Sequence, residues 1–198
     1  FNTDWRDAED GYDTVEWAAA QPWSTSRVGT FGYSYPSWTQ WALAPTKPPH
    51  LVTMFTGGMA PRTTDWELGG VFRAGRVIEW TLGSMAPDTQ RFLEQPYGPN
   101  TVEGYEHLQE HVNRDKWLWF LPWKDLPLEA IGGLRDRFND WLAHHNEDRW
   151  HFEDNFEKIA LPIFHRTGWY DRLSLTVDFF RGMRERGATQ EARESQRL

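Results

Sequence analysis

The sequence "RVGTFGYSYPSWTQWAL", residues Arg27–Leu43, contains the clearest change from one kind of secondary structure to another. Its first half carries the β-branched and aromatic residues typical of a short buried strand, and its second half, from Pro36, has a helical pattern. Ser34 falls where the expected strand meets the expected helix. Gly32 precedes it by two residues, as in the G-x-S-x-G turn that holds a nucleophilic serine. Pro36 takes the place of the second glycine, so a serine that caps the helix is the competing interpretation.

The neighbouring segments extend this pattern. A helix is predicted before it, over Ala8–Gln21, and a second buried strand after it, over Leu51–Gly58. Strand character returns at Ile159–Asp171, and an amphipathic helix follows over Leu173–Gly187. Its inward residues are predicted to be Leu173, Val177, Phe180 and Met183. Strands that alternate with helices predict an α/β fold with a mainly parallel sheet.

The middle of the chain has a different character. Residues 62–157 contain helix-like stretches rich in Trp, Phe, Glu and Arg, and no clear strand. We therefore predict three parts, with residues 1–61 and 158–198 forming the α/β core and residues 62–157 forming a helical cap. Trp117, Trp119, Phe120 and Trp123 are expected to be cap core and pocket lining, with an exposed recognition patch as the alternative.

Composition removes several classes of function. The chain has 198 residues, no cysteine and a net charge of −8. Disulfides, thiol nucleophiles and thiolate metal sites are therefore excluded. Phosphate backbones and anionic membranes attract clustered positive charge, which this sequence lacks, so neither nucleic acid nor a membrane is an expected partner. No run of apolar residues is long enough to span a bilayer.

Four motifs then point to one family. The chain contains D-T-V-E-W at Asp13–Trp17, Q-P-W-S-T-S-R-V-G at Gln21–Gly29, G-Y-S-Y-P-S-W-T-Q at Gly32–Gln40 and G-W-Y-D at Gly168–Asp171. These resemble the cocaine esterase-like branch of the X-Pro dipeptidyl-peptidase family, which are serine hydrolases of the α/β-hydrolase fold. The resemblance covers most of the chain. At Ser26 the family usually has glycine, which affects a turn and leaves the chemistry unchanged.

The resemblance implies roles for particular residues. Ser34 would be the nucleophile, Asp171 the acid of the triad, and the backbone N–H of Tyr35 a donor to the oxyanion. The residues implied to line the substrate pocket are Pro36 and Leu173, with Trp66, Phe72 and Trp80 as looser candidates. The substrate would be a small ester or amide, or a short peptide, and no cofactor is expected.

The histidine of the triad is the missing part. An α/β-hydrolase orders its triad Ser, Asp, His along the chain, yet no histidine follows His165. In the family this histidine lies beyond a strand that often begins like "QRL", the last three residues here. We therefore expect a fragment truncated at both ends, with apolar sheet edges exposed, that lacks its base and has at most trace activity alone. A homo-oligomer is left open.

Three other functions compete with an ester hydrolase. A proline-specific dipeptidyl-peptidase is the nearest. Arg172 and Leu173 after Asp171 argue against another set of relatives, the α-amino-acid ester hydrolases, which bind a substrate ammonium with acids next to the triad aspartate. A non-catalytic module that uses the aromatic cleft to bind a ligand is the second. A zinc site at H-x-x-E-H, His107–His111, is the third, and is disfavoured because it explains one motif and not two.

Overall fold

The computed structural model describes residues 6–58, 67–68, 71–72, 75, 81, 116–117, 119–127, 135–143, 152–171 and 175–198. The chain divides into two compact units. One comprises Asn2–Thr63 and Asp148–Leu198, and the other comprises Thr64–Glu147 together with Phe1. We call the first the sheet unit and the second the inserted unit. Within the described residues, no helix is long and apolar enough to cross a membrane.

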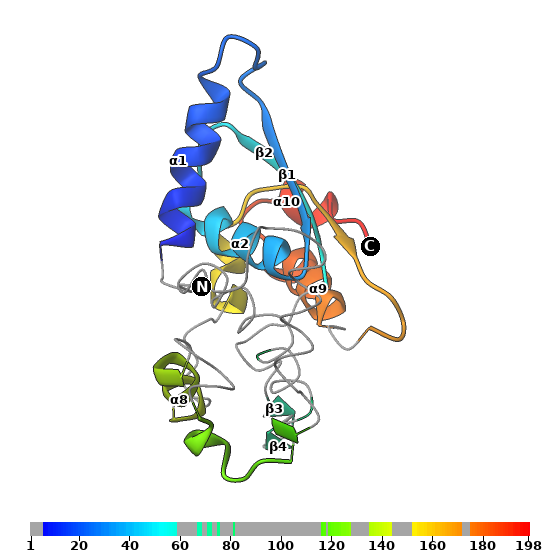
Figure 1. Cartoon of the computed structure of the whole chain (residues 1–198). Coiled ribbons are helices and arrows are strands. Elements are labelled where there is room, and N and C mark those ends of the chain that lie inside the picture. The colour runs from blue at the N-terminus through cyan, green and yellow to red at the C-terminus, as the bar shows by residue number, and fades with distance from the viewer. Residues whose placement is uncertain are drawn as a thin grey trace. The chain divides into compact units, whose positions relative to one another are not determined.

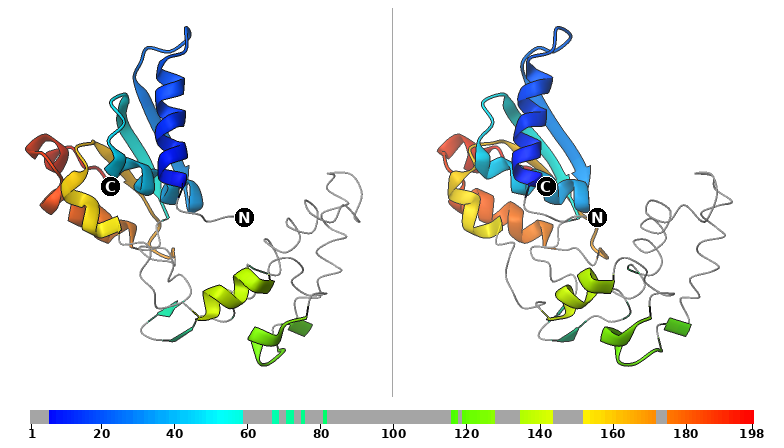
Figure 2. Two further views of the ribbon diagram at one scale, coloured as in Figure 1. Left: turned by 90° about the vertical axis from the view of Figure 1, so that its left-hand side faces the viewer. Right: turned by 60° about the vertical axis from the view of Figure 1, so that its left-hand side comes forward.

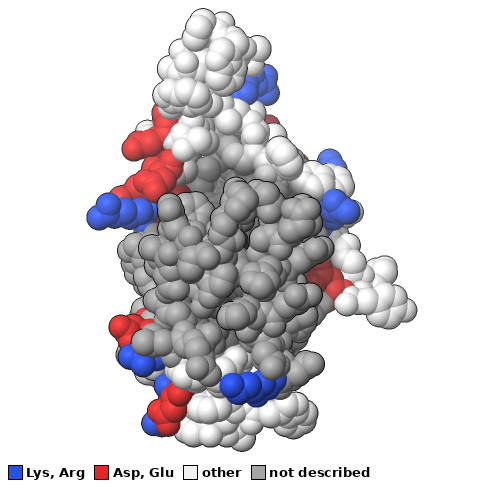
Figure 3. All heavy atoms as spheres, in the orientation of Figure 1, with Lys and Arg blue, Asp and Glu red and all other residues white. Residues whose placement is uncertain are grey.

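The sheet unit is an α/β structure, as the sequence predicts (Figure 1). Its strands are β1 (Val28–Tyr33), β2 (Leu51–Gly57) and β5 (Ile163–Arg166). Its helices are α1 (Asp7–Ala19), α2 (Tyr35–Leu43), α9 (Thr176–Arg186) and α10 (Gln190–Glu194), with short 3-10 helices η1 (Ala44–Thr46) and η6 (Phe152–Lys158). Acidic side chains gather in the first turn of α1, along the outer side of the unit (Figure 3).

The three strands are parallel and lie in the order β1-β2-β5. Their register aligns Thr30 with Met54 and Ile163, and the next residue of each strand forms the next row. Beyond β5, Arg197 makes an isolated parallel bridge to Phe164, and the His165 amide donates to the Arg197 carbonyl at 2.7 Å. Strand pairing therefore resumes at the "QRL" segment, as the sequence predicts.

One face of this sheet carries the hydrophobic core. Side chains from α1, α2, β2, η6, β5 and α9 form a single buried cluster on it. Trp41 of α2 is at its centre, fully buried, with its ring centroid 4.7 Å from that of Phe179 and 5.8 Å from that of Phe156. Figure 2 shows η6, α9 and α10 grouped beside one another.

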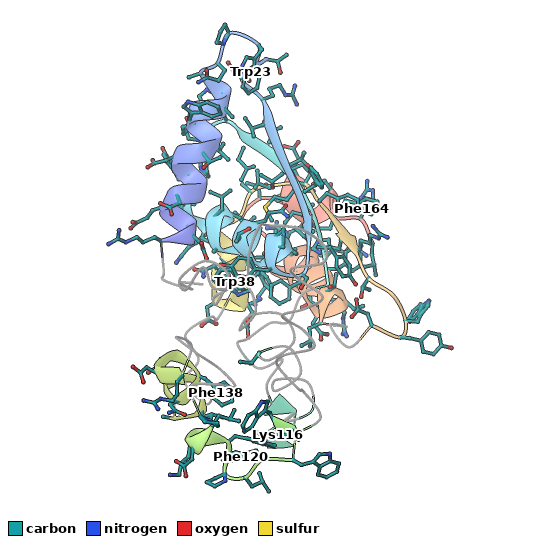
Figure 4. The ribbon with its side chains drawn as sticks, viewed as in Figure 1. Trp23, Trp38, Lys116, Phe120, Phe138 and Phe164 are labelled. Carbon is teal, nitrogen blue, oxygen red and sulfur yellow. The ribbon has the colours of Figure 1, made fainter. Side chains whose placement is uncertain are left out.

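The opposite face of the sheet is open. Phe31, Phe55 and Phe164 are aligned across the three strands, one residue along from the buried row. The rings of Phe55 and Phe164 stack at 5.0 Å, and Phe31 is 84% exposed. Phe164 is labelled on β5 in Figure 4. We call these three residues the phenylalanine row. They lie on a face of the sheet, whereas the sequence-based expectation concerned its edges and stays a prediction.

The inward face of α9 differs from the prediction. Phe179 and Met183 are buried, whereas Phe180 is only partly buried and packs against the His165 ring. The cause is a close contact with η6, since a Cβ at Gly182 would lie 2.7 Å from Cδ2 of Phe156. Contact at Gly182 turns Phe179 and Met183 toward the sheet. Met183 was predicted correctly, and Leu173 lies outside the described residues.

The described residues of the inserted unit form short elements. They are an antiparallel pair, β3 (Glu67–Leu68) and β4 (Val71–Phe72), the 3-10 helix η4 (Trp123–Asp125) and the helix α8 (Arg135–Ala143). Trp117, Leu126 and Phe138 are buried, whereas Trp119 is exposed. The aromatic run thus divides between core and surface. A two-strand pair was not predicted, although Gly69-Gly70 is a known hairpin signal. The cap of residues 62–157 stays a prediction.

Candidate active site

Ser34 occupies a strained turn between β1 and α2. Its backbone has φ 62° and ψ −124°, a conformation rare for a residue with a side chain. Its side chain makes no capping hydrogen bond to α2, so the helix-cap interpretation is wrong. The turn is tight, because a Cβ at Gly32 would lie 2.8 Å from the carbonyl carbon of Pro36. Such strain costs about 1–3 kcal/mol and is found mostly at functional sites.

Hydrogen bonds fix the turn on both sides. The Ser34 amide donates to the Gly57 carbonyl at 2.9 Å, and the Gly57 amide donates to the buried Ser37 hydroxyl at 3.1 Å. Gln40 is also buried; its side-chain oxygen accepts from Thr30 of β1 at 2.8 Å. These contacts attach α2 directly to β1 and β2. The sharp turn at Ser34 is thereby held from the helix as well as from the strand.

Tyr35 is the first residue of α2. The backbone N–H groups in the first turn of a helix point toward its N-terminus and have no partner within the helix, so in α2 they point toward the Ser34 turn. The Tyr35 phenol donates to Asp7 of α1 at 2.8 Å, and its ring stacks on Trp38 at 5.4 Å. Burial first, and then the Asp7 carboxylate, raise the pKa of this phenol above its usual range. The phenol therefore stays protonated at neutral pH and holds the start of α2 against α1.

Asp171 lies after β5, at the same edge of the sheet as Ser34. Because β1 and β5 are parallel, their carboxyl ends meet at one edge, with only β2 between them. The Asp171 amide donates to the Gly168 carbonyl at 3.0 Å, which closes the loop. The phenol of Tyr33 donates a hydrogen bond to Oδ2 of Asp171. The residue next to the serine thus contacts the predicted acid, 138 positions further along the chain.

Two histidines lie in the described part of the chain, and neither faces Ser34. His165 is fully buried beneath Trp41; its Nε2 contacts Oε1 of Gln196 at 2.8 Å, and its Nδ1 has no partner in the structure described. Burial lowers the pKa of His165 to about 4, with the Gln196 contact opposing the shift. His50 lies just before β2, at the opposite end of the strands, and pairs with Glu16 at 2.7 Å.

The other predicted site residues are only partly visible. Pro36 is exposed in the first turn of α2, and Phe72 ends β4. Trp66, Trp80, Leu173 and the H-x-x-E-H segment at 107–111 lie outside the described residues. No group of three or more His, Asp or Glu side chains that could hold a metal ion occurs among the residues described.

Sequence reasoning missed the role of Tyr33 and part of the turn at Ser26. Tyr33 gives no local signal, because its partner is defined by the sheet and not by spacing. Ser26 has φ 58°, a left-handed conformation that glycine adopts without strain. The left-handed backbone conformation therefore explains why glycine is usual at this position in the family that the sequence resembles. The departure of this sequence adds a local strain at the start of β1.

A parallel sheet, helices that connect its strands and a serine on a strained strand-to-helix turn define an α/β-hydrolase. The particular family follows from a family model, described as X-Pro dipeptidyl-peptidase (S15 family), which matches residues 1–195. The chain therefore belongs to this family of hydrolases, as its motifs predict. A search of curated proteins finds no match.

Proposed function

We propose that the chain carries the nucleophile and the acid of a serine hydrolase that cleaves a carboxylic ester or amide by acyl transfer. The observation that carries the proposal is the Ser34 turn, where a strained serine whose side chain makes no capping hydrogen bond stands at the edge of a parallel sheet. A serine that only filled a turn would gain nothing from this strain. The same edge holds Asp171, which the family resemblance suggests as the acid.

The steps follow from these positions. Oγ of Ser34 attacks the substrate carbonyl carbon and gives its proton to a histidine base, which Asp171 orients. The Tyr35 amide donates to the oxyanion that forms. The tetrahedral intermediate collapses, and the alcohol or amine leaves with the proton from the histidine. Water then gives a proton to the histidine and attacks the carbonyl carbon of the acyl-enzyme. The carboxylic acid product leaves, and the proton returns to Oγ of Ser34.

The base is expected after Asp171 in chain order. His165 does not suit this task, because its ring lies within the core and burial lowers its pKa to about 4. His50 is at the amino ends of the strands, whereas Ser34 is at the carboxyl ends. Both observations support a base from another part of the protein.

The substrate side of the proposal favours an uncharged ester or amide. Recognition of the free amino terminus of a dipeptide needs carboxylates close to the reacting bond. The residues after Asp171 are Arg172 and Leu173, neither of which is an acid. A cocaine esterase-like hydrolase with an apolar acyl pocket is therefore the proposed specificity, and an Xaa-Pro dipeptidyl-peptidase is the second candidate because the family model carries that description.

A fluorophosphonate probe on the full-length protein tests the proposal. Wild type is expected to be labelled, Ser34→Ala to lose labelling, and hydrolysis of p-nitrophenyl butyrate to fall by roughly 10⁴-fold or more. Ser24→Ala, in the loop before β1, is the matched control and should label like wild type. Absence of labelling in wild type would favour the binding module. Faster turnover of an Xaa-Pro p-nitroanilide than of the ester would favour the peptidase.

A further inference from the structure

The ring of Tyr33 lies across the end of β2. Tyr33 belongs to the open face of the sheet, in the row that aligns it with Gly57 and Arg166. A Cβ at Gly57 would lie 2.8 Å from Cδ2 of Tyr33, and a Cβ at Gly58 would lie 2.6 Å from its Cζ. No side chain fits between the ring and the backbone there. The two glycines that end β2 thus provide the flat surface that the Tyr33 ring covers.

In this position the Tyr33 side chain starts from β1 and crosses β2, so its hydroxyl lies on the side of β2 that faces β5. Adjacent strands are about 4.8 Å apart, so β1 and β5 are separated by roughly 10 Å. A tyrosine that crosses over Gly57 and Gly58 can span this gap, and its hydroxyl donates to Oδ2 of Asp171. The guanidinium of Arg166 is 5.9 Å from the centroid of the same ring. The phenol thereby joins the strand of the serine to the loop of the acid.

We propose that Tyr33 is a positioning residue that holds the Asp171 carboxylate in the orientation required by the base, an inference that rests on the proposed function. A carboxylate can accept about four hydrogen bonds. A donor fixed on Oδ2 limits rotation of the group, so the carboxylate keeps one orientation toward an imidazole N–H. Because Tyr33 and Ser34 are consecutive residues, the same short piece of backbone fixes the positions of the nucleophile and of the tyrosine that contacts Asp171.

Two roles are open to the same ring, and they differ in what the hydroxyl does. If Tyr33 only fills space over Gly57 and Gly58, a phenylalanine does the same and the hydroxyl is dispensable. If Tyr33 positions Asp171, the hydroxyl acts only through that carboxylate. Removing the carboxylate should then remove the effect of the hydroxyl as well. The second behaviour is specific to a positioning residue.

The experiment uses Tyr33→Phe and Asp171→Ala, alone and combined, in the full-length protein. Tyr33→Phe is expected to lower kcat for p-nitrophenyl butyrate by roughly 10- to 100-fold with KM within about twofold, the effect of losing one hydrogen bond to a charged group. In the Asp171→Ala background the same change should alter kcat by less than about twofold. Tyr170→Phe, whose hydroxyl is exposed beside the acid, is the control and should match wild type.

A second measurement does not depend on activity. The ¹³Cγ resonance of Asp171 should shift in Tyr33→Phe and stay in place in Tyr170→Phe, with the unfolding midpoint unchanged in both. Equal kcat in Tyr33→Phe and wild type, equal losses in both backgrounds, or an unchanged Asp171 resonance would each overturn the inference. A wild type that no fluorophosphonate labels would overturn the proposed function instead, and the resonance would then decide the Tyr33 contact alone.

Discussion

The two faces of the sheet are made by the same three strands, yet they meet different surroundings. On one face Met54, Ile163 and His165 lie beneath helices that meet at Trp41. On the other, one residue along each strand, the phenylalanine row is exposed. Alternation along a strand separates the two sets completely. The comparison shows that apolar residues in these strands do not all contribute equally to stability. The candidate active site lies at the carboxyl ends of the strands, where both faces end.

Parallel sheets are normally covered by helices on both faces. Here the described helices contribute to the core of one face. Tyr33 belongs to the open face, whereas Ser37 and Gln40 hold α2 against the covered face. The Ser34 turn therefore receives support from both faces. Changes in the buried cluster of the covered face should therefore act on stability, and changes in the phenylalanine row of the open face should act on association.

The largest effect is expected at the centre of the covered face. Trp41→Ala leaves a cavity between Phe156 and Phe179 and should lower the free energy of unfolding by about 3–5 kcal/mol. Urea unfolding of the full-length protein measures this. Trp169→Ala, at a residue 97% exposed, is the control and should change stability by less than about 0.5 kcal/mol. Similar losses in the two variants would contradict the division between faces.

The next effect depends on pH and belongs to His165. Folding lowers the pKa of His165 from 6.5 to about 4, so between these values the unfolded chain binds a proton that the folded chain does not. Stability therefore rises with pH in this window. The contribution is complete above pH 6.5 and is lost as pH falls toward 4, a change of about 3 kcal/mol.

A variant isolates this contribution from that of the carboxylates. His165→Gln should reduce the loss of stability between pH 7 and pH 4 by that amount, as measured by urea unfolding at a series of pH values. Parallel pH profiles for His165→Gln and wild type would mean that folding leaves the pKa of His165 unshifted, and would contradict the prediction.

The comparison also explains what the sequence could predict. The three strands of the sheet unit, α1, α2 and the turn at Ser34 depend on local signals, and each was placed within a few residues. The inward face of α9 was wrong at Phe180, because the helix has apolar residues on two sides and Gly182 selects between them through η6. The contact of Tyr33 with Asp171 spans 138 positions and depends on the strand order. No local pattern encodes that order.

The smallest effect on stability is expected on the open face, where it should accompany a clear effect on association. Phe31→Thr puts a β-branched residue, which favours a strand, in place of a ring that is 84% exposed, so stability should change by less than about 0.5 kcal/mol. A contiguous exposed apolar row favours self-association. Sedimentation of the 198-residue chain at rising concentration should therefore show less association in Phe31→Thr than in wild type.

Trp23→Ser is the control, because Trp23 is 70% exposed but lies in the loop before β1, away from the row (Figure 4). Equal association in Phe31→Thr and wild type would mean that the row is not the surface that drives it, and the two faces would then differ in burial alone.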